Sequence, residues 1–285
     1  MKLPSFDYHA PKSLDEAVAL LAASEGSARV LAGGQSLMPV MAFRLATPSA
    51  LVDLRHIDGL DQIEIVGREI KIGAMTRWRM IEESRELKRT VPVLPAAMEH
   101  VAHYQIRNRG TVGGSLAHAD PAAEFPALAV GCDAVIDVIG SKGARAIKAA
   151  DLFTGALETS LKDDEIITAV RIPTWPKLRR WGFQEFTRRR GDFAIAGVMA
   201  FFDLDVQGVA SNTHISVFGA TDIPRRLNKA EAALDGKRVD ETAIEAVASI
   251  AMSEVNPQSD LHATSDYRRS LVGTMTKRAL AQAAK

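Results

Sequence analysis

The stretch that decides the fold is ARVLAGGQSL, residues 28–37. Its first half, residues 28–32, is a short apolar run that predicts a β-strand, and it leads directly into the pair Gly33 and Gly34. A glycine pair after a strand is typical of a loop, because glycine adopts positive φ angles at no steric cost. A second segment, TVGGSL at residues 111–116, has the same pattern and is also predicted to be a loop.

The two glycine segments share a chemistry that suits a pyrophosphate. Adjacent glycines let consecutive backbone N–H groups turn toward an anion without interference from a Cβ atom, and the serine that follows offers a hydroxyl donor. The spacing alone leaves an alternative open. A chain with 20 glycines contains glycine pairs by chance, and both segments would then be ordinary turns.

Regular elements are predicted on both sides of these segments. Ser13 followed by Glu16 is a capping box that predicts a helix ending at Ala23, and residues 63–66 and 70–72 alternate as a hairpin. These patterns favour an α+β fold over a series of βαβ units. Further helices are predicted at 76–88, capped by Thr76, at 92–101 and at 121–131, and further strands at 51–54, 134–139, 166–172, 183–187, 193–204 and 214–218.

The C-terminal part of the chain has a pattern of its own. Strands prevail between residues 183 and 218, and helical patterns dominate from Lys229 onward. Two prolines, Pro173 and Pro176, interrupt both helix and strand ladders just before this part. We therefore predict one domain over residues 1–175 and a second, a small antiparallel sheet with a helix bundle, over residues 176–285.

Composition excludes several classes of function. Among the 285 residues, 35 Lys and Arg balance 35 Asp and Glu, so no net field draws the chain to nucleic acid or to an anionic membrane. Residues 1–10 lack a signal-peptide pattern and no apolar run is long enough to span a bilayer, which predicts a cytoplasmic protein. Cys132 is the only cysteine, so this chain alone cannot form a disulfide or hold an iron–sulfur cluster, and redox chemistry would need an organic cofactor.

Four segments together resemble a known family. Residues 111–124, TVGGSLAHADPAAE, are similar to the second flavin signature of the molybdenum hydroxylase flavoproteins, and residues 31–37 are similar to the first. QIRNRG at 105–110 and RRGDFA at 189–194 match two further segments of that family. The resemblance spans nearly the whole chain, and the length is closest to the separate medium subunit of carbon monoxide dehydrogenase-like enzymes rather than to the fused xanthine dehydrogenases.

The resemblance implies an FAD-binding domain of the vanillyl-alcohol-oxidase-like (PCMH) type, with subdomains at about 1–55 and 56–175 and with FAD between the two glycine segments. Glu124 matches an acidic position that accepts hydrogen bonds from the cofactor, and Ile167 matches an apolar position near it. The chain departs from the family at Ser115, where Asn is common, and at Phe193, where Tyr is frequent, so that Phe193 can shield the ring but cannot transfer a proton. The implied cofactor contacts are Ala32, Gly33, Gly34, Gln35, Ser36, Leu37, Thr111, Val112, Gly113, Gly114, Ser115, Asp120, Glu124, Ile167 and Phe193.

The resemblance also implies an electron-transfer subunit with no catalytic residue or metal of its own. Electrons would arrive from iron–sulfur clusters of a small subunit, after substrate oxidation at the molybdenum cofactor of a large subunit, and would leave to a quinone, NAD or oxygen. The assembly would be a dimer of heterotrimers, and its substrate could be carbon monoxide, an aldehyde or an N-heterocycle. The FAD should be noncovalent because Cys132 is poorly placed for a thioether. The alternatives are a free-standing FAD oxidoreductase and a nucleotide-binding module without turnover.

Other residues have ordinary explanations beside functional ones. Asp120 precedes a predicted helix start and is either a helix cap or part of the cofactor loop. Cys132 is expected to be a small buried residue at the start of a strand, because no cationic neighbour in sequence would lower its pKa. The run Arg188, Arg189 and Arg190 is either a solvated face or a docking site. His100 and His103 are expected to be helix-surface residues rather than metal ligands, and Met38 and Met41 to be packing residues.

Overall fold

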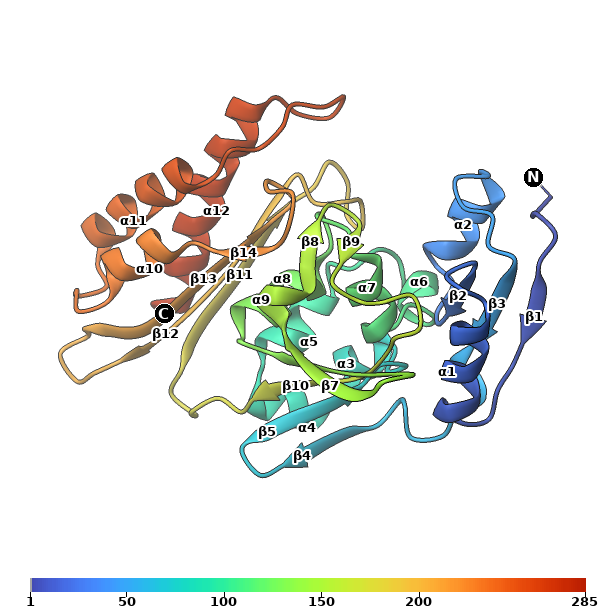
Figure 1. The fold of residues 1–285 in the computed structure, drawn as a ribbon. Helices are drawn as coiled ribbons and strands as arrows, with labels where there is room; N and C mark the ends of the chain where they lie inside the picture. Colours follow the sequence, from blue (N-terminus) through green and yellow to red (C-terminus); the bar gives the residue numbers. More distant parts are fainter. Residues whose placement is uncertain (1) are drawn as a thin grey trace.

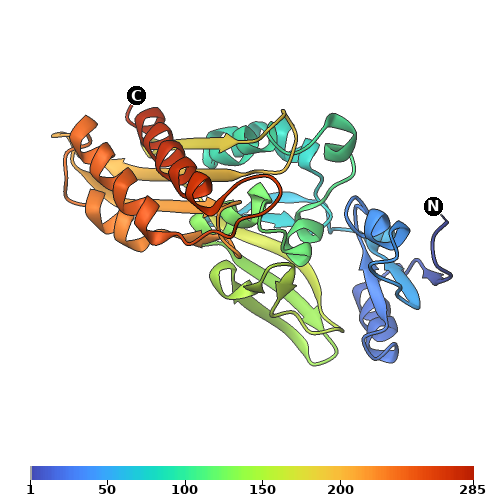
Figure 2. The same cartoon turned by 90° about the horizontal axis from the view of Figure 1, so that it is seen from above.

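The computed structural model describes residues 2–285 and has three parts that follow one another along an elongated molecule (Figure 1). A small sheet with two helices lies at the N-terminal end, a larger sheet with several short helices lies in the middle, and a third sheet covered by long helices lies at the C-terminal end. The view from above in Figure 2 shows the same order. The mixed α+β fold with a C-terminal sheet-and-helix domain is therefore confirmed.

The N-terminal sheet is parallel and has the strand order β1-β3-β2. Its first helix begins as predicted, because the Ser13 side chain accepts a hydrogen bond from the Glu16 N–H at 3.2 Å. The parallel pairing differs from the sequence expectation, since helices cross over between the strands and return the chain to the same end of the sheet. The elements are β1 (Asp7–His9), α1 (Leu14–Ala23), β2 (Ala28–Leu31), α2 (Leu37–Ala42), β3 (Ala50–Asp53) and the 3-10 turn η1 (Leu54–His56).

The central sheet is antiparallel, with the strand order β4-β5-β10-β6-β7, and the hairpin predicted at residues 63–72 forms its edge. Short helices pack their apolar side chains against this sheet. Its strands are β4 (Ile63–Val66), β5 (Glu69–Gly73), β6 (Val135–Gly140), β7 (Gly143–Lys148) and β10 (Ile166–Pro173), beside the small pair β8 (Phe153–Gly155) and β9 (Glu158–Thr159). Its helices are α3 (Trp78–Glu83), α4 (Arg85–Thr90), α5 (Val93–Met98), α6 (Tyr104–Arg107), α7 (Val112–His118), α8 (Glu124–Gly131) and α9 (Ala149–Leu152).

The helix predicted at residues 76–88 is two helices, and its predicted cap is wrong. Helix α3 follows Arg77, and the Thr76 side chain is fully buried with its hydroxyl unpaired among the described residues. Ser84 divides the two helices, because its side chain accepts a hydrogen bond from the Leu87 N–H at 3.2 Å and starts α4.

The C-terminal part is a four-stranded antiparallel sheet between two hydrophobic cores. Side chains of strand β12 (Ala196–Leu204) point alternately to the two cores. Val198 and Phe202 face the long helices, whereas Met199 and Phe201 pack in the same core as α5 and α8. This strand begins at Ala196 rather than at the predicted Phe193, because residues 187–193 form a turn. The elements are β11 (Arg180–Phe186), β12 (Ala196–Leu204), β13 (Ala210–Phe218), β14 (Arg225–Arg226), α10 (Asn228–Leu234), α11 (Glu241–Glu254) and α12 (Ser265–Ala283).

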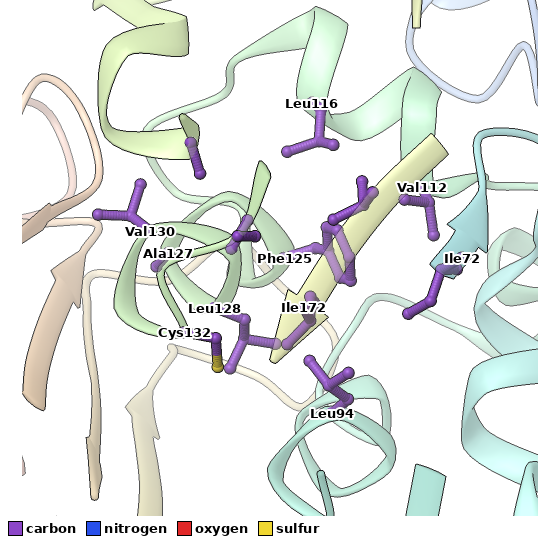
Figure 3. Close-up of a cluster of buried hydrophobic side chains, with 14 of the residues drawn as sticks. Ile72, Leu94, Val112, Leu116, Phe125, Ala127, Leu128, Val130, Cys132 and Ile172 are labelled. Atoms are coloured by element: carbon purple, nitrogen blue, oxygen red, sulfur yellow. The ribbon is translucent and has the colours of Figure 1, made fainter. Parts of the chain in front are cut away.

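The main core lies between the central sheet and its helices. Figure 3 shows Val112 and Leu116 of α7 close to Phe125 of α8, with Ile72 of the sheet and Leu94 of α5 beside them. Each such side chain contributes about 1.5–3 kcal/mol when fully buried. In this way the core fixes the position of α7 and of the start of α8.

Cys132 is buried, as predicted, at the end of α8 rather than at the start of a strand. Burial raises the pKa of its thiol, so it is a packing residue rather than a nucleophile.

Candidate functional site

A cavity of about 700 Å³ lies where the N-terminal sheet meets the central part of the chain. This volume is within the usual range for sites that bind cofactors and other small molecules. One wall is the segment from β2 to α2, and the opposite wall is formed by α7, the start of α8 and the turn at Gly191–Phe193. All of the sequence-predicted contact residues line it except Val112: Ala32, Gly33, Gly34, Gln35, Ser36, Leu37, Thr111, Gly113, Gly114, Ser115, Asp120, Glu124, Ile167 and Phe193.

The first glycine segment leaves a row of backbone donors unpaired. Among the described residues, no backbone N–H group from Gly33 to Leu37 donates a hydrogen bond to the protein. Gly34 has a φ of 71°, which favours glycine, and Ser36 is in the right-handed helical region just before α2 begins at Leu37. The segment therefore keeps a row of free donors at the cavity wall, as the sequence predicted for a loop.

Gly33 is needed for a different reason than the sequence suggested. Its φ is not positive, but a Cβ atom there would lie 2.2 Å from the Arg109 carbonyl oxygen. Arg109 lies just before the second glycine segment, so the first segment packs against the chain that leads into the second. Only a residue without a side chain fits between them.

The second glycine segment is a helix, so the predicted loop at residues 111–116 is wrong. Thr111 caps α7, and its hydroxyl accepts a hydrogen bond from the Gly114 N–H at 3.2 Å. The Val112 and Gly113 N–H groups donate to the carbonyl groups of Thr76 and Ala74, at 3.0 and 2.7 Å. These N–H groups already have partners, unlike those from Gly33 to Leu37.

Val112 does not contact the cavity. Its side chain is fully buried and, as Figure 3 shows, points into the core beside Phe125. Val112 is thus the one sequence-predicted contact residue outside the cavity lining, because the helical turn sends it inward while Thr111 and Ser115 face the cavity.

Two acidic residues stand at the start of α8. The Asp120 carboxylate accepts a hydrogen bond from the Ala122 N–H at 2.8 Å, which shapes the turn before the helix but does not cap it. Pro121 lies within this turn, and α8 begins at Glu124 rather than at the predicted Pro121. Glu124 is 9% exposed, and its burial, together with the charge of Glu185, raises the pKa of its carboxyl to about 8.

Apolar and aromatic groups complete the cavity. Ile167 lies on β10 and is 5% exposed, whereas Phe193 lies in the turn before β12 and is 71% exposed. Sequence reasoning did not single out Trp78, because an aromatic residue on a predicted helix carries no specific signal, and it interpreted His103 as a helix-surface residue, whereas both line the cavity. Asp192 also lines the cavity, and its signal was its place in the segment at 189–194.

The remaining candidates lie outside the cavity or at its edge. Arg188, Arg189 and Arg190 are exposed, and Arg188 pairs with Asp192 at 3.3 Å. His100 lies beyond the end of α5 and is not on a helix as predicted. Within residues 2–285 there is no cluster of side chains with the composition of a metal site, and no helix is long and apolar enough to cross a membrane.

Two family models together cover nearly the whole chain. The FAD-binding domain in molybdopterin dehydrogenase matches residues 4–175, and the C-terminal domain of the carbon monoxide dehydrogenase flavoprotein matches residues 181–283. The chain belongs to the molybdopterin dehydrogenase flavoproteins. It is thus a subunit type found in oxidoreductase complexes, and its domain binds FAD.

Relatives of this flavoprotein family match over their full length. The chain is 40% identical to the nicotine 6-hydroxylase medium subunit of Paenarthrobacter nicotinovorans over 99% of both chains. It is 35% identical to the carbon monoxide dehydrogenase medium chain of Hydrogenophaga pseudoflava, over 97% of this chain and 96% of the relative. A solved structure of carbon monoxide dehydrogenase from Hydrogenophaga pseudoflava matches with a TM-score of 0.96 at 37% identity, over 99% of this chain and 98% of that chain.

The cavity fits the cofactor of this flavoprotein family. A flavin dinucleotide needs donors for its pyrophosphate and apolar surfaces for its ring system, and both are present. The Gly33 to Leu37 N–H groups are the donors, and Ile167 and Phe193 are apolar groups at the wall.

Proposed function

We propose that this chain binds FAD in the cavity described above and passes electrons from iron–sulfur clusters of a partner subunit to an external acceptor. The observation that carries the proposal is the row of unpaired N–H donors from Gly33 to Leu37, in a chain that matches the flavoprotein family from residue 4 to residue 283. When bound, FAD supplies an isoalloxazine ring that accepts and donates electrons.

The residues divide the tasks of binding the cofactor. The Gly33 to Leu37 segment holds the pyrophosphate through its N–H groups and the Ser36 hydroxyl, with Ala32 at its base. Ser115 and Asp120 face the ribityl part of the cofactor. Glu124 keeps a proton near neutral pH, so it can donate a hydrogen bond to the cofactor instead of only accepting one.

Two apolar residues shield the ring. Ile167 is fixed on β10 and gives a rigid wall, whereas Phe193 is exposed in a turn and can cover the other side. Phe193 has no hydroxyl, so its contribution is the exclusion of water rather than proton transfer.

Electrons must reach this site across a protein interface. The single cysteine is buried and cannot hold an iron–sulfur cluster, which needs several thiolates. We infer an iron–sulfur small subunit and a molybdenum large subunit, assembled as a dimer of heterotrimers, and the names of the relatives as medium subunits support this. Similar chains serve complexes named for nicotine and for carbon monoxide, so we infer that the choice of substrate lies outside this chain.

We also propose a domain boundary between residues 173 and 177, with subdomains that meet near residue 55. The end of one family model at residue 175 and the start of the next at 181 support the first boundary. The change from the parallel sheet, which ends at Asp53, to the central sheet, which begins at Ile63, supports the second.

The test compares the isolated chain with the reconstituted complex. We expect the purified chain to carry FAD that denaturation releases completely, to be reduced by dithionite, and to remain oxidised with candidate substrates. Turnover should appear only after both partner subunits are added, as monitored by flavin absorbance. Reduction of the flavin by a substrate in the metal-free isolated chain would instead indicate a free-standing oxidoreductase, and a colourless chain that takes up no FAD would indicate that the cavity is not a flavin site.

A further inference from the structure

Glu124 is a protonated acid at the wall of the cofactor cavity. It is the first residue of α8, lines the cavity and is 9% exposed. With its pKa raised to about 8, first by burial and then by the charge of Glu185, the carboxyl retains its proton at neutral pH. A buried group with such a pKa can both give and take a proton under working conditions.

Glu185 is a second buried acid, and its charge acts on the first. It lies on β11 on the same face as Phe183, and its side chain is 1% exposed. Among the described residues, no group forms a well-oriented hydrogen bond with either carboxyl oxygen. A buried acid without such a bond destabilises a fold, so its presence on an apolar face calls for a functional explanation.

His100 connects this pair to the surface. Its Nδ1 atom lies 3.3 Å from Oε2 of Glu185, and its side chain is 44% exposed. The ring packs against Phe183 with 5.1 Å between centroids, which holds it beside the carboxylate. Imidazole is the side chain that exchanges protons with water most readily near neutral pH.

We propose that His100, Glu185 and Glu124 form a proton path from the solvent to the cofactor cavity. The inference rests on the proposed function, because reduction of a flavin takes up protons as well as electrons while an iron–sulfur relay delivers electrons alone. Glu124 releases its proton toward the cavity, the Glu185 carboxylate accepts a proton from the His100 ring and passes it on to the Glu124 carboxylate, and His100 takes up a proton from water. The electrons arrive separately from the partner's clusters, so the path ends each cycle with its starting charge.

The groups around the path agree with this assignment. Its residues come from three places: α8 carries Glu124, β11 carries Glu185, and His100 lies in the turn after α5, a helix that packs on both α8 and β11. The one further charged group that influences Glu124 is Asp120, whose negative charge also favours the protonated form. Within the described residues, no cation neutralises Glu124, so its proton remains available for transfer.

The first experiment uses the full chain loaded with FAD. Flash photoreduction in weak buffer with a pH-indicator dye measures the rate of proton uptake in wild type, Glu185→Gln and Glu99→Gln. Glu99 is an exposed carboxylate next to His100 and serves as the matched control. We expect at least a tenfold slower uptake in Glu185→Gln and no change in Glu99→Gln. Equal rates in all three proteins would overturn the path.

A second readout does not depend on the flavin. In apoprotein with isotope-labelled glutamate, infrared titration of the protonated carboxyl band should show that Glu185→Gln lowers the pKa of Glu124, because a negative neighbour is removed. An unchanged titration would show that the two carboxyls do not interact, and this result too would overturn the path.

The third variant is His100→Ala, at the exposed end. Proton uptake should slow at least tenfold and should recover when free imidazole is added, because imidazole can enter the space of the missing ring. A purely structural role of His100 predicts no recovery and would contradict the path. A chain that binds no FAD refutes the proposed function, whereas normal FAD binding with unaltered proton uptake in both variants refutes only the path.

Discussion

At the scale of single residues, close backbone contacts and buried charges determine the site. The two glycines of the first segment have different tasks, since Gly34 has a positive φ whereas Gly33 lies against the Arg109 carbonyl. Glu124 owes its raised pKa to burial more than to neighbouring charge. The close contact at Gly33 and the burial of Glu124 both come from the folded structure, so neither can be inferred from the residue type alone.

Replacing Gly33 by alanine tests the close approach. The added Cβ would lie 2.2 Å from a carbonyl oxygen, and overpacking of this kind costs about 1–3 kcal/mol of stability. We expect FAD affinity to fall at least tenfold, as measured by fluorescence titration. Gly59→Ala is the control: its φ of 81° is also strained by a side chain, but nothing lies within 4 Å of the new Cβ. It should lose stability and keep its FAD affinity, and equal FAD affinities in the two variants would argue against the contact.

The pKa of Glu124 predicts a pH-dependent stability. The folded protein binds this proton more tightly than the unfolded chain between about pH 4.5 and 8, so the stabilisation is fully present below this window and is lost as the pH rises through it. The unfolding free energy of the wild-type apoprotein minus that of Glu124→Gln should therefore decrease as the pH rises through this window, by up to about 1.4 kcal/mol per pH unit. Urea unfolding at several pH values measures this difference, and a constant difference would contradict the raised pKa.

At the scale of elements, α7 shows why glycine misleads a reading of sequence. Each glycine within a helix costs about 1 kcal/mol relative to alanine, so a glycine pair favours a loop. In the structure, a Cβ at Gly113 would lie 2.6 Å from the Ala74 Cβ, so α7 needs a glycine there to approach the end of β5. Packing between distant segments thus outweighs local propensity.

A pair of threonine substitutions tests the start of α7. Thr111→Val removes the hydroxyl that caps the helix, which should lower the unfolding free energy by about 1 kcal/mol and weaken FAD binding. Thr76→Val in the neighbouring segment removes a buried hydroxyl that has no partner among the described residues, so it should be neutral or stabilising. Thermal unfolding with and without FAD measures both. If the two variants lost equal stability, the cap would have no special role.

At the scale of the whole molecule, one core joins the two segments matched by the family models. Leu94 and Leu128 from the first share a cluster with Met199 and Phe201 from the second. The sheet of the C-terminal part therefore supports α8, which carries Glu124, and β11 supplies Glu185. The site depends on both parts even though the unpaired N–H donors from Gly33 to Leu37 belong to the first.

This shared core predicts cooperative unfolding. Scanning calorimetry of the apoprotein should show a single transition, and FAD at a hundred times its dissociation constant should stabilise the whole chain by about 2.7 kcal/mol. If calorimetry resolved two transitions and FAD raised the midpoint temperature of only one of them, the two parts would unfold independently.

The sequence by itself determined the family, the order of most helices and strands, and the first glycine segment. Helix caps such as Ser13, the alternation of the hairpin at residues 63–72 and the flavin-signature motifs are local patterns that a linear sequence displays directly. Only the tertiary structure decided that the second glycine segment is a helix, that Val112 points into the core, and that the charge of Glu185 acts on Glu124. These features arise from contacts between residues far apart in the chain, where packing and burial override local preference and shift the pKa of groups that look ordinary in the sequence.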